Sequence, residues 1–210
     1  ENRVGFQSDI RRSTVIHQAR RFAVNHCRAE RVASHALSLY DQSHGVLHHD
    51  FGQGRELLWA AAMLHACGQH INLSAYHKHS WYLIRHGELL GYSQSEHLIV
   101  AAIARYHRKS LPKKRHEEWQ VLEDREHRAI VAEMSLLLRL AVALDQRPNP
   151  VVSSIQVKSI KDEIHLSLFP EYSEQNLTLE QWSLQNCEGV VREICGLELK
   201  VGVGDRDAIE

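Results

Sequence analysis

Apolar residues recur with the period of an α-helix through most of the chain, up to about Gln146. Such a stripe buries one face of a helix, so a succession of stripes predicts a helical bundle. The clearest stripes are Val15, Ala19, Phe22 and Ala23; Val32, Ala36, Leu39 and Tyr40; Leu57, Ala61 and Leu64; Ile99, Ala102 and Ile103; and Ile130, Met134, Leu137, Leu138 and Ala141.

Polar and turn-forming residues predict where several of these helices begin and end. Ser8 is placed to cap the first helix. The segment Ser93–Glu96 matches a capping box that opens the fourth. Gly68 is expected to end the third helix. Pro148 and Pro150 are expected to end the last one, since proline cannot continue a helix.

The pattern changes beyond Pro150. Two short runs with partial alternation, Val151–Ile160 and Glu163–Phe169, are separated by two residues and predict a hairpin. Leu179–Ile194 has helical spacing, and Leu197–Val201 alternates like a final strand. The order of these elements predicts a small ββαβ lobe.

The chain is therefore expected to be mainly α with a small α+β lobe. We place the helical domain in residues 1–149 and the ββαβ lobe in residues 150–210. With 43% hydrophobic and 24% charged residues, the composition is ordinary for a globular protein of 210 residues that buries a full core.

Charge and hydropathy exclude several partners. A formal net charge of -1 gives no overall field that would attract DNA. The longest apolar run, Leu57–Leu64, is far shorter than the roughly 20 residues of a membrane helix, and no signal peptide is present, so no membrane partner is expected. The chain starts at Glu1 without a methionine, which suggests a fragment of a longer protein.

The four cysteines indicate the compartment. No two of them have the CxxC spacing of metal or redox motifs, so we interpret them as reduced thiols of a cytoplasmic protein. They are Cys27, Cys67, Cys187 and Cys195.

Among the 16 histidines, His65, His79 and His107 lie in or at the ends of successive helices. The helices of a bundle can bring such side chains together, and neutral imidazole is a common ligand of transition metals. The set therefore indicates either a metal site or a buried polar cluster that joins the helices. The residue after His65 is Ala66, so a carboxylate that would hold a hard cation is missing there.

The segment from Arg105 to Arg115 contains six basic residues and no acidic one. Arginine and lysine bind phosphoryl oxygens through charge-assisted hydrogen bonds, so the segment is a candidate polyanion-binding strip. The alternative is a solvated helix exit, which Pro112 marks. The candidate phosphate-binding residues are Arg105, His107, Arg108, Lys109 and Lys113.

Three segments of this region carry a family resemblance: Ala61–His65, His77–Ile84 and Arg105–Lys109. Their order resembles the C-terminal region of the exopolyphosphatase / guanosine pentaphosphate phosphohydrolase family. Met63–Gly68 also resembles the "LHDIG" segment of HD-superfamily phosphohydrolases. The resemblance extends to Leu136–Asp145 and to the terminal lobe, and it implies an HD-like helical bundle.

An active HD site holds a divalent metal with a histidine from an early helix, a His-Asp doublet and an aspartate from a late helix. The resemblance places Arg28 at the first position, His65 and Ala66 at the doublet, and Val142 at the last. Asp145 follows three residues later. Because two carboxylates are missing and a cation replaces one ligand, we expect a vestigial site without metal and no catalytic residue in this chain.

In this family, the resemblance further implies, the phosphatase reaction belongs to an N-terminal actin-like domain, for which Mg²⁺ is expected. This chain would then be the accessory C-terminal part, without a cofactor of its own. It would assist the binding of polyphosphate or guanosine pentaphosphate and contribute to a homodimer.

Two other functions stay open from the sequence. One is a divergent metal-dependent HD phosphohydrolase that uses His65, His79, His107 and Asp145. The other is an interaction module whose terminal lobe, residues 151–210, pairs domains or protomers.

Overall fold

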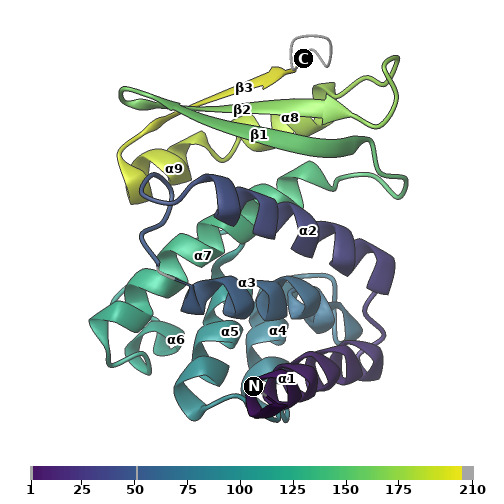
Figure 1. Cartoon of the computed structure of the whole chain (residues 1–210). Coiled ribbons are helices and arrows are strands. Elements are labelled where there is room, and N and C mark those ends of the chain that lie inside the picture. The colour runs from purple at the N-terminus through teal and green to yellow at the C-terminus, as the bar shows by residue number, and fades with distance from the viewer. Residues whose placement is uncertain (1, 51, 205–210) are drawn as a thin grey trace.

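The computed structural model describes residues 2–50 and 52–204, with side-chain burial described from residue 7 onward. A helical domain lies beneath a small sheet that is backed by two short helices (Figure 1). The helices are α1 (Asn2–Arg21), α2 (His26–Gln42), α3 (Gln53–Leu64), the 3₁₀ helix η1 (Cys67–His70), α4 (Tyr76–His86), α5 (Gln94–Tyr106), α6 (Glu117–Gln120), α7 (Arg125–Leu144), α8 (Thr178–Gln185) and α9 (Glu188–Cys195). The strands are β1 (Val152–Ile160), β2 (Glu163–Pro170) and β3 (Glu198–Val203).

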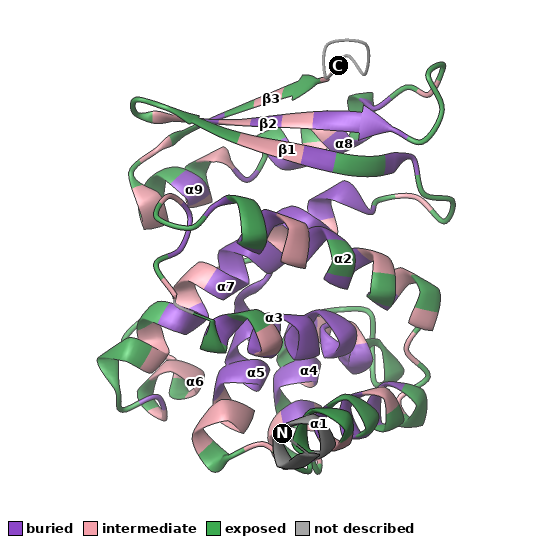
Figure 2. Ribbon diagram, in the orientation of Figure 1, coloured by how far each residue is buried: buried purple, intermediate pink, exposed green. Residues whose placement is uncertain are grey.

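The predicted apolar stripes form most of the core. Buried residues are concentrated along α3, α5 and α7, whereas α1 exposes much of its surface (Figure 2). Every residue of Leu57–Leu64 is buried, so α3 runs through the middle of the domain and its alanines let neighbouring helices approach closely. The mainly α fold with a small α+β lobe is confirmed. Among the described residues, no helix is both long and apolar enough to cross a membrane.

The helix ends were predicted with mixed success. The capping box at Ser93 is confirmed: its hydroxyl accepts from the Glu96 backbone nitrogen at 3.2 Å, and the Glu96 carboxylate accepts from the Ser93 nitrogen at 2.7 Å. The cap at Ser8 is wrong, because α1 begins upstream of it at Asn2. Phe22 and Ala23 lie beyond the end of α1 rather than on its buried face.

Gly68 has a different role from the predicted one. The last residue of α3 is Leu64, and Gly68 lies within η1. A Cβ at Gly68 would collide with the Tyr76 carbonyl oxygen and the Ser80 backbone nitrogen. The glycine therefore lets η1 pack directly on α4, and its nitrogen donates to the Ser80 hydroxyl at 2.9 Å.

The terminal lobe differs from the predicted ββαβ order by one helix. The single helix expected over Leu179–Ile194 is divided into α8 and α9 at Asn186 and Cys187. The hairpin of β1 and β2 is antiparallel, and β3 adds to β2 in parallel, as the intervening helices allow. The lobe packs on α2 and α7. The boundary between residues 149 and 150 stays a prediction.

Candidate functional site

The ends of α3 and α5 bring His65 and His107 into contact. Their ring centroids lie 5.1 Å apart in an edge-to-face arrangement, and the two residues are 2% and 1% exposed. Each Nδ1 lies 2.6 Å from the carbonyl oxygen three residues earlier, that of Ala62 or Ala104. A carbonyl oxygen only accepts, so each Nδ1 carries the proton and each Nε2 is left as an acceptor.

Tyr76, the first residue of α4, completes this cluster. Its hydroxyl donates to His107 Nε2 at 3.0 Å. Burial raises the pKa of Tyr76, which keeps the phenol protonated. The Arg108 guanidinium lies over the Tyr76 ring, 4.6 Å from its centroid. The three helices α3, α4 and α5 are thus joined by a chain of polar contacts.

The predicted cluster of His65, His79 and His107 is only partly formed. His79 is half-buried and makes no contact with the other two, in a part of the chain that the structure describes throughout. Its neighbour His77 is the buried histidine, 3% exposed, and Nδ1 of His77 has no hydrogen-bond partner among the described residues. The residues on the inward face of α4 follow the helical period, and His79 is not among them. They are Tyr76, His77, Ser80 and Trp81.

The imidazoles of His65 and His107 are neutral at pH 7. Burial lowers the pKa of His65 to about 4. Burial and the neighbouring His65 also hold the pKa of His107 well below its ordinary value. His107 therefore offers no positive charge to a phosphate at neutral pH.

Arg28 of α2 and Asp145, which follows the last residue of α7, form an ion pair that links the two helices. Arg28 Nε lies 3.1 Å from Asp145 Oδ2, and Arg28 Nη2 donates to the Asp145 carbonyl oxygen at 3.1 Å. Arg31 Nε binds the other carboxylate oxygen at 2.8 Å. The side chain of Asp145 is only 2% exposed, so its charge is compensated by these two guanidinium groups.

The four HD-like positions come together in part. Arg28, His65 and Ala66 line one cavity of about 360 Å³. Val142, half-buried on α7, is not among its lining residues. Within the described chain, no three side chains of His, Cys, Asp or Glu are grouped so that they could hold a metal ion. The donor set does not fit a divalent cation, because a guanidinium lines the cavity and the nearest carboxylate, Asp145, is already paired.

The basic strip divides into buried and exposed members. Arg105 is 3% exposed, and its Nε binds Glu118 Oε1 at 2.7 Å. With its charge compensated inside the fold, Arg105 is not available to a polyanion, contrary to the prediction. Arg108 is half-buried, and Lys109 and Lys113 are exposed.

Sequence reasoning missed Arg139, which fixes the backbone of this strip. Its Nη2 donates to the carbonyl oxygens of Tyr106 and Lys109 at 3.0 and 3.1 Å. Lys109 has a positive φ of 62°, a conformation that these bonds help to hold. Burial lowers the pKa of Arg139, with Arg108 contributing in the same direction. No sequence motif marks this arginine, since it lies on the largely apolar helix α7.

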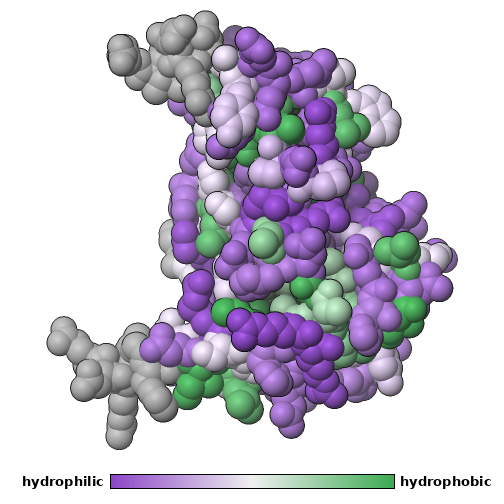
Figure 3. Space-filling model, turned by 90° about the vertical axis from the view of Figure 1, so that its right-hand side faces the viewer, coloured by the Kyte–Doolittle hydropathy of each residue, from purple (hydrophilic) through white to green (hydrophobic). Residues whose placement is uncertain are grey.

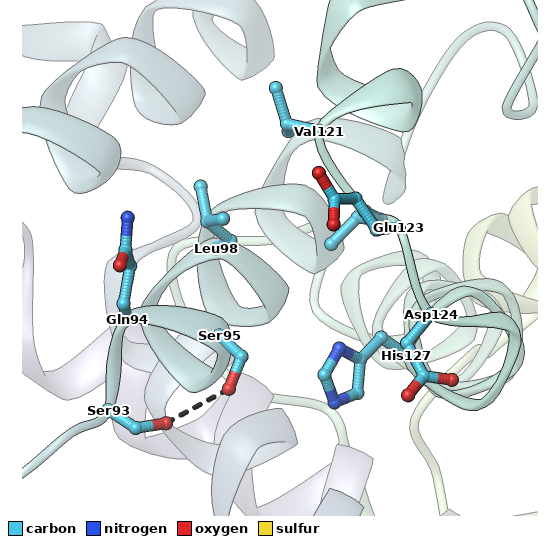
Figure 4. Close-up of a pocket in the computed structure, with 9 residues that line it drawn as sticks. Ser93, Gln94, Ser95, Leu98, Val121, Glu123, Asp124 and His127 are labelled. Carbon is cyan, nitrogen blue, oxygen red and sulfur yellow. Dashed lines mark hydrogen bonds between the residues drawn. The ribbon is translucent and has the colours of Figure 1, made fainter.

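The most voluminous of the described cavities, about 620 Å³, lies elsewhere, between the start of α5 and the segment that leads into α7 (Figure 4). Its lining includes the carboxylates of Glu123 and Asp124, and the hydroxyls of Ser93 and Ser95 form a hydrogen bond of 3.1 Å. An acidic lining does not suit a phosphate chain. The face shown in Figure 3 is mainly hydrophilic, with hydrophobic side chains in small separate groups.

The comparison with known proteins can now be set against this geometry. A family model described as "Ppx/GppA phosphatase, domain III" matches residues 10–188. The chain belongs to the Ppx/GppA phosphatase family. The resemblance carried by the histidine-rich segments is thereby confirmed, and the match extends from α1 into α9 of this domain III chain.

Curated Ppx/GppA relatives carry the name guanosine-5'-triphosphate,3'-diphosphate pyrophosphatase. One from Pseudoalteromonas translucida (strain TAC 125) is 33% identical over 75% of this chain and 31% of its own length. Another from Vibrio campbellii (strain ATCC BAA-1116) is 31% identical over 81% of this chain and 33% of its own length. The chain thus spans about a third of the length of the curated relatives it matches.

Proposed function

We propose that this domain III chain is a non-catalytic accessory part of an enzyme that hydrolyses phosphoanhydrides. The observation that supports the proposal most is the ion pair of Arg28 with Asp145 beside His65, at the place that the HD resemblance assigns to a metal. A fixed guanidinium repels the divalent ion that would ionise a water molecule there. The chemistry is assigned instead to an N-terminal actin-like domain, with Mg²⁺ as its cofactor.

The accessory role that we assign is to hold a polyanionic substrate. Arg108, Lys109 and Lys113 present positive charge on one loop, and Arg139 fixes the backbone of that loop from beneath. A prepositioned loop loses little conformational entropy when it binds a chain of phosphates. Polyphosphate and guanosine pentaphosphate both supply such oxygens, and the names of the relatives favour a guanosine substrate for the parent enzyme.

A cytoplasmic homodimer is the assembly that we expect for the parent enzyme. The alternative of a pure interaction module is less favoured, because the large exposed apolar residues are scattered over several elements, among them Leu73, Leu90 and Trp182.

The test is a titration of the chain with long-chain polyphosphate at several salt concentrations. Arg108→Ala with Lys109→Ala should weaken binding and reduce the salt dependence by about one to two cations. Arg125→Ala with Lys158→Ala removes the same charge from exposed positions outside the strip and serves as the matched control. Binding that ignores both salt and the first double variant would contradict the proposal.

A further inference from the structure

The cavity beside His65 has a lining that suits an anion. It lies between the end of α1, the start of α2 and the end of α3, and has a volume of about 360 Å³. Its polar lining residues are Asn25, Arg28, His65, Gln69 and His70, and none of the described residues that line it is acidic. A space of this size holds a phosphate group together with part of an attached molecule.

Arg28 supplies this cavity with a fixed positive charge. Its Nε and its Nη2 are engaged by Asp145, whereas Nη1 has no partner among the described residues. Arg31 shares the same carboxylate but does not line the cavity. Two guanidinium groups and one carboxylate leave one net positive charge, and the Asp145 clamp holds the orientation of the Arg28 fork.

His65 supplies a hydrogen-bond acceptor. The ring is 2% exposed, and its Nδ1 proton is given to the Ala62 carbonyl oxygen at 2.6 Å. Nε2 keeps its lone pair and has no hydrogen-bond partner in the described part of the chain, and it is not among the atoms that are both unpaired and sealed from solvent, so it is open to the cavity. Because this acceptor faces the cavity and no protein donor occupies it, a ligand that brings an O–H group can hydrogen-bond to it.

A partly protonated phosphate meets both requirements at once. Its charged oxygens match Arg28, and its P–OH group can donate to His65 Nε2. Ala66 stands where the resemblance expects an aspartate, so no carboxylate repels the phosphate. We propose that this cavity is a binding site for orthophosphate or for the phosphate of a small phosphomonoester, in place of a metal centre.

The experiment uses the 210-residue chain and calorimetric titration with inorganic phosphate, guanosine monophosphate and sulfate at matched ionic strength and about pH 6, where both phosphates retain a proton. We expect saturable binding of phosphate with one site per chain, or of the monophosphate if the esterified form is the preferred source. Sulfate carries no proton at this pH and cannot donate to His65, so its affinity should be about tenfold lower.

Variants locate the site. Arg28→Gln should weaken phosphate binding about tenfold or more, since a charge-assisted bond is lost. Arg31→Gln removes the net positive charge of the cluster but no group that lines the cavity, so it should weaken binding only about threefold, clearly less than Arg28→Gln. Ala66→Leu fills the cavity while every ion pair is kept, and should also abolish binding even if Arg28→Gln fails to fold.

The proposal is overturned if neither phosphate nor the monophosphate saturates, if sulfate binds equally well, or if Ala66→Leu leaves binding unchanged. Such a failure would leave the polyanion-binding strip untouched, because Arg108, Lys109 and Lys113 do not line this cavity.

Discussion

His65 and His107 are two buried imidazoles whose value to the fold lies in their neutral form. Each one caps the last turn of its own helix through Nδ1, and His107 also accepts from Tyr76. The sequence indicated that three histidines from successive helices would meet. His65 and His107 do meet, whereas His79 does not. The prediction lacked the orientation of α4. The spacing of Tyr76, Ser80 and Trp81 indicates which face of this helix is buried, but the search considered histidines alone.

Stability is expected to fall as the pH is lowered from 6.5 toward 4. The pKa of His65 is lowered by burial to about 4, so between these values the unfolded chain binds a proton that the folded chain does not. The free energy of unfolding therefore decreases with decreasing pH, by about 3 kcal/mol from His65 alone. Urea unfolding at a series of pH values measures this slope.

The same measurement on His65→Gln should give a shallower slope, because the residue that resists protonation has been removed. His79→Gln is the matched control, since it removes a histidine outside the pair. Equal slopes in all three proteins would show that the buried pair does not govern the acid response.

Glu118 is expected to be far more important to stability than its neighbour Glu117. Glu118 compensates the buried Arg105, so Glu118→Ala leaves an unpaired internal cation and should cost about 3 kcal/mol. Glu117 pairs with Arg85 on the surface, where its side chain is 75% exposed, and Glu117→Ala should cost less than about 1 kcal/mol. Chemical denaturation of the two variants gives the comparison; similar losses would mean that Arg105 is not held by Glu118.

At the scale of elements, the sequence was most informative where a local motif fixes the backbone. The Ser93 capping box, the buried face of α7 and the β1–β2 hairpin were all predicted correctly. The predicted cap at Ser8 was wrong because a polar residue on the surface of a helix has the same local sequence pattern as a cap. The break between α8 and α9 was not predicted, because Asn186 and Cys187 interrupt the helix without a proline or glycine to mark the position.

Close packing of η1 against α4 depends on Gly68. Gly68→Ala forces a Cβ into backbone atoms of α4 and should lower the free energy of unfolding by about 2 kcal/mol or more. It should also displace Tyr76 from His107, which the ultraviolet spectrum of the tyrosine would report. Gly189→Ala in α9 meets nothing within 4 Å and should be neutral or slightly stabilising. Equal effects of the two changes would contradict the packing argument.

For the whole molecule, the mainly helical fold was predicted correctly, whereas the HD resemblance stays a prediction and its chemistry depends on a few positions. Arg28, His65 and Ala66 share a cavity as the resemblance implied, whereas Val142 does not line it. The partners of Arg28 could not be foreseen, because Asp145 and Arg31 meet it only once α2 and α7 have packed. The sequence thus indicated which positions to compare, and the structure adds the contacts that those residues make.

Mn²⁺ is expected to leave the thermal midpoint of the chain unchanged, since Arg28 repels a dication at this position. Arg28→His combined with Ala66→Asp restores two of the missing ligands and should give a midpoint that rises with Mn²⁺. A calorimetric scan with and without the metal provides the measurement. A rise in the unaltered chain would instead support the metal-dependent phosphohydrolase.

The segment that joins the bundle to the lobe is fastened along its length. Asp145 is tied to Arg28 and Arg31, the Pro148 carbonyl oxygen accepts from Arg31 at 3.5 Å, and Arg147 Nε lies 2.9 Å from the fully buried Glu180 of α8. Because of these contacts, the sheet is not expected to move independently of the helical bundle. A polypeptide truncated after residue 149 would lose these contacts and expose one side of α7, so the two parts should unfold together.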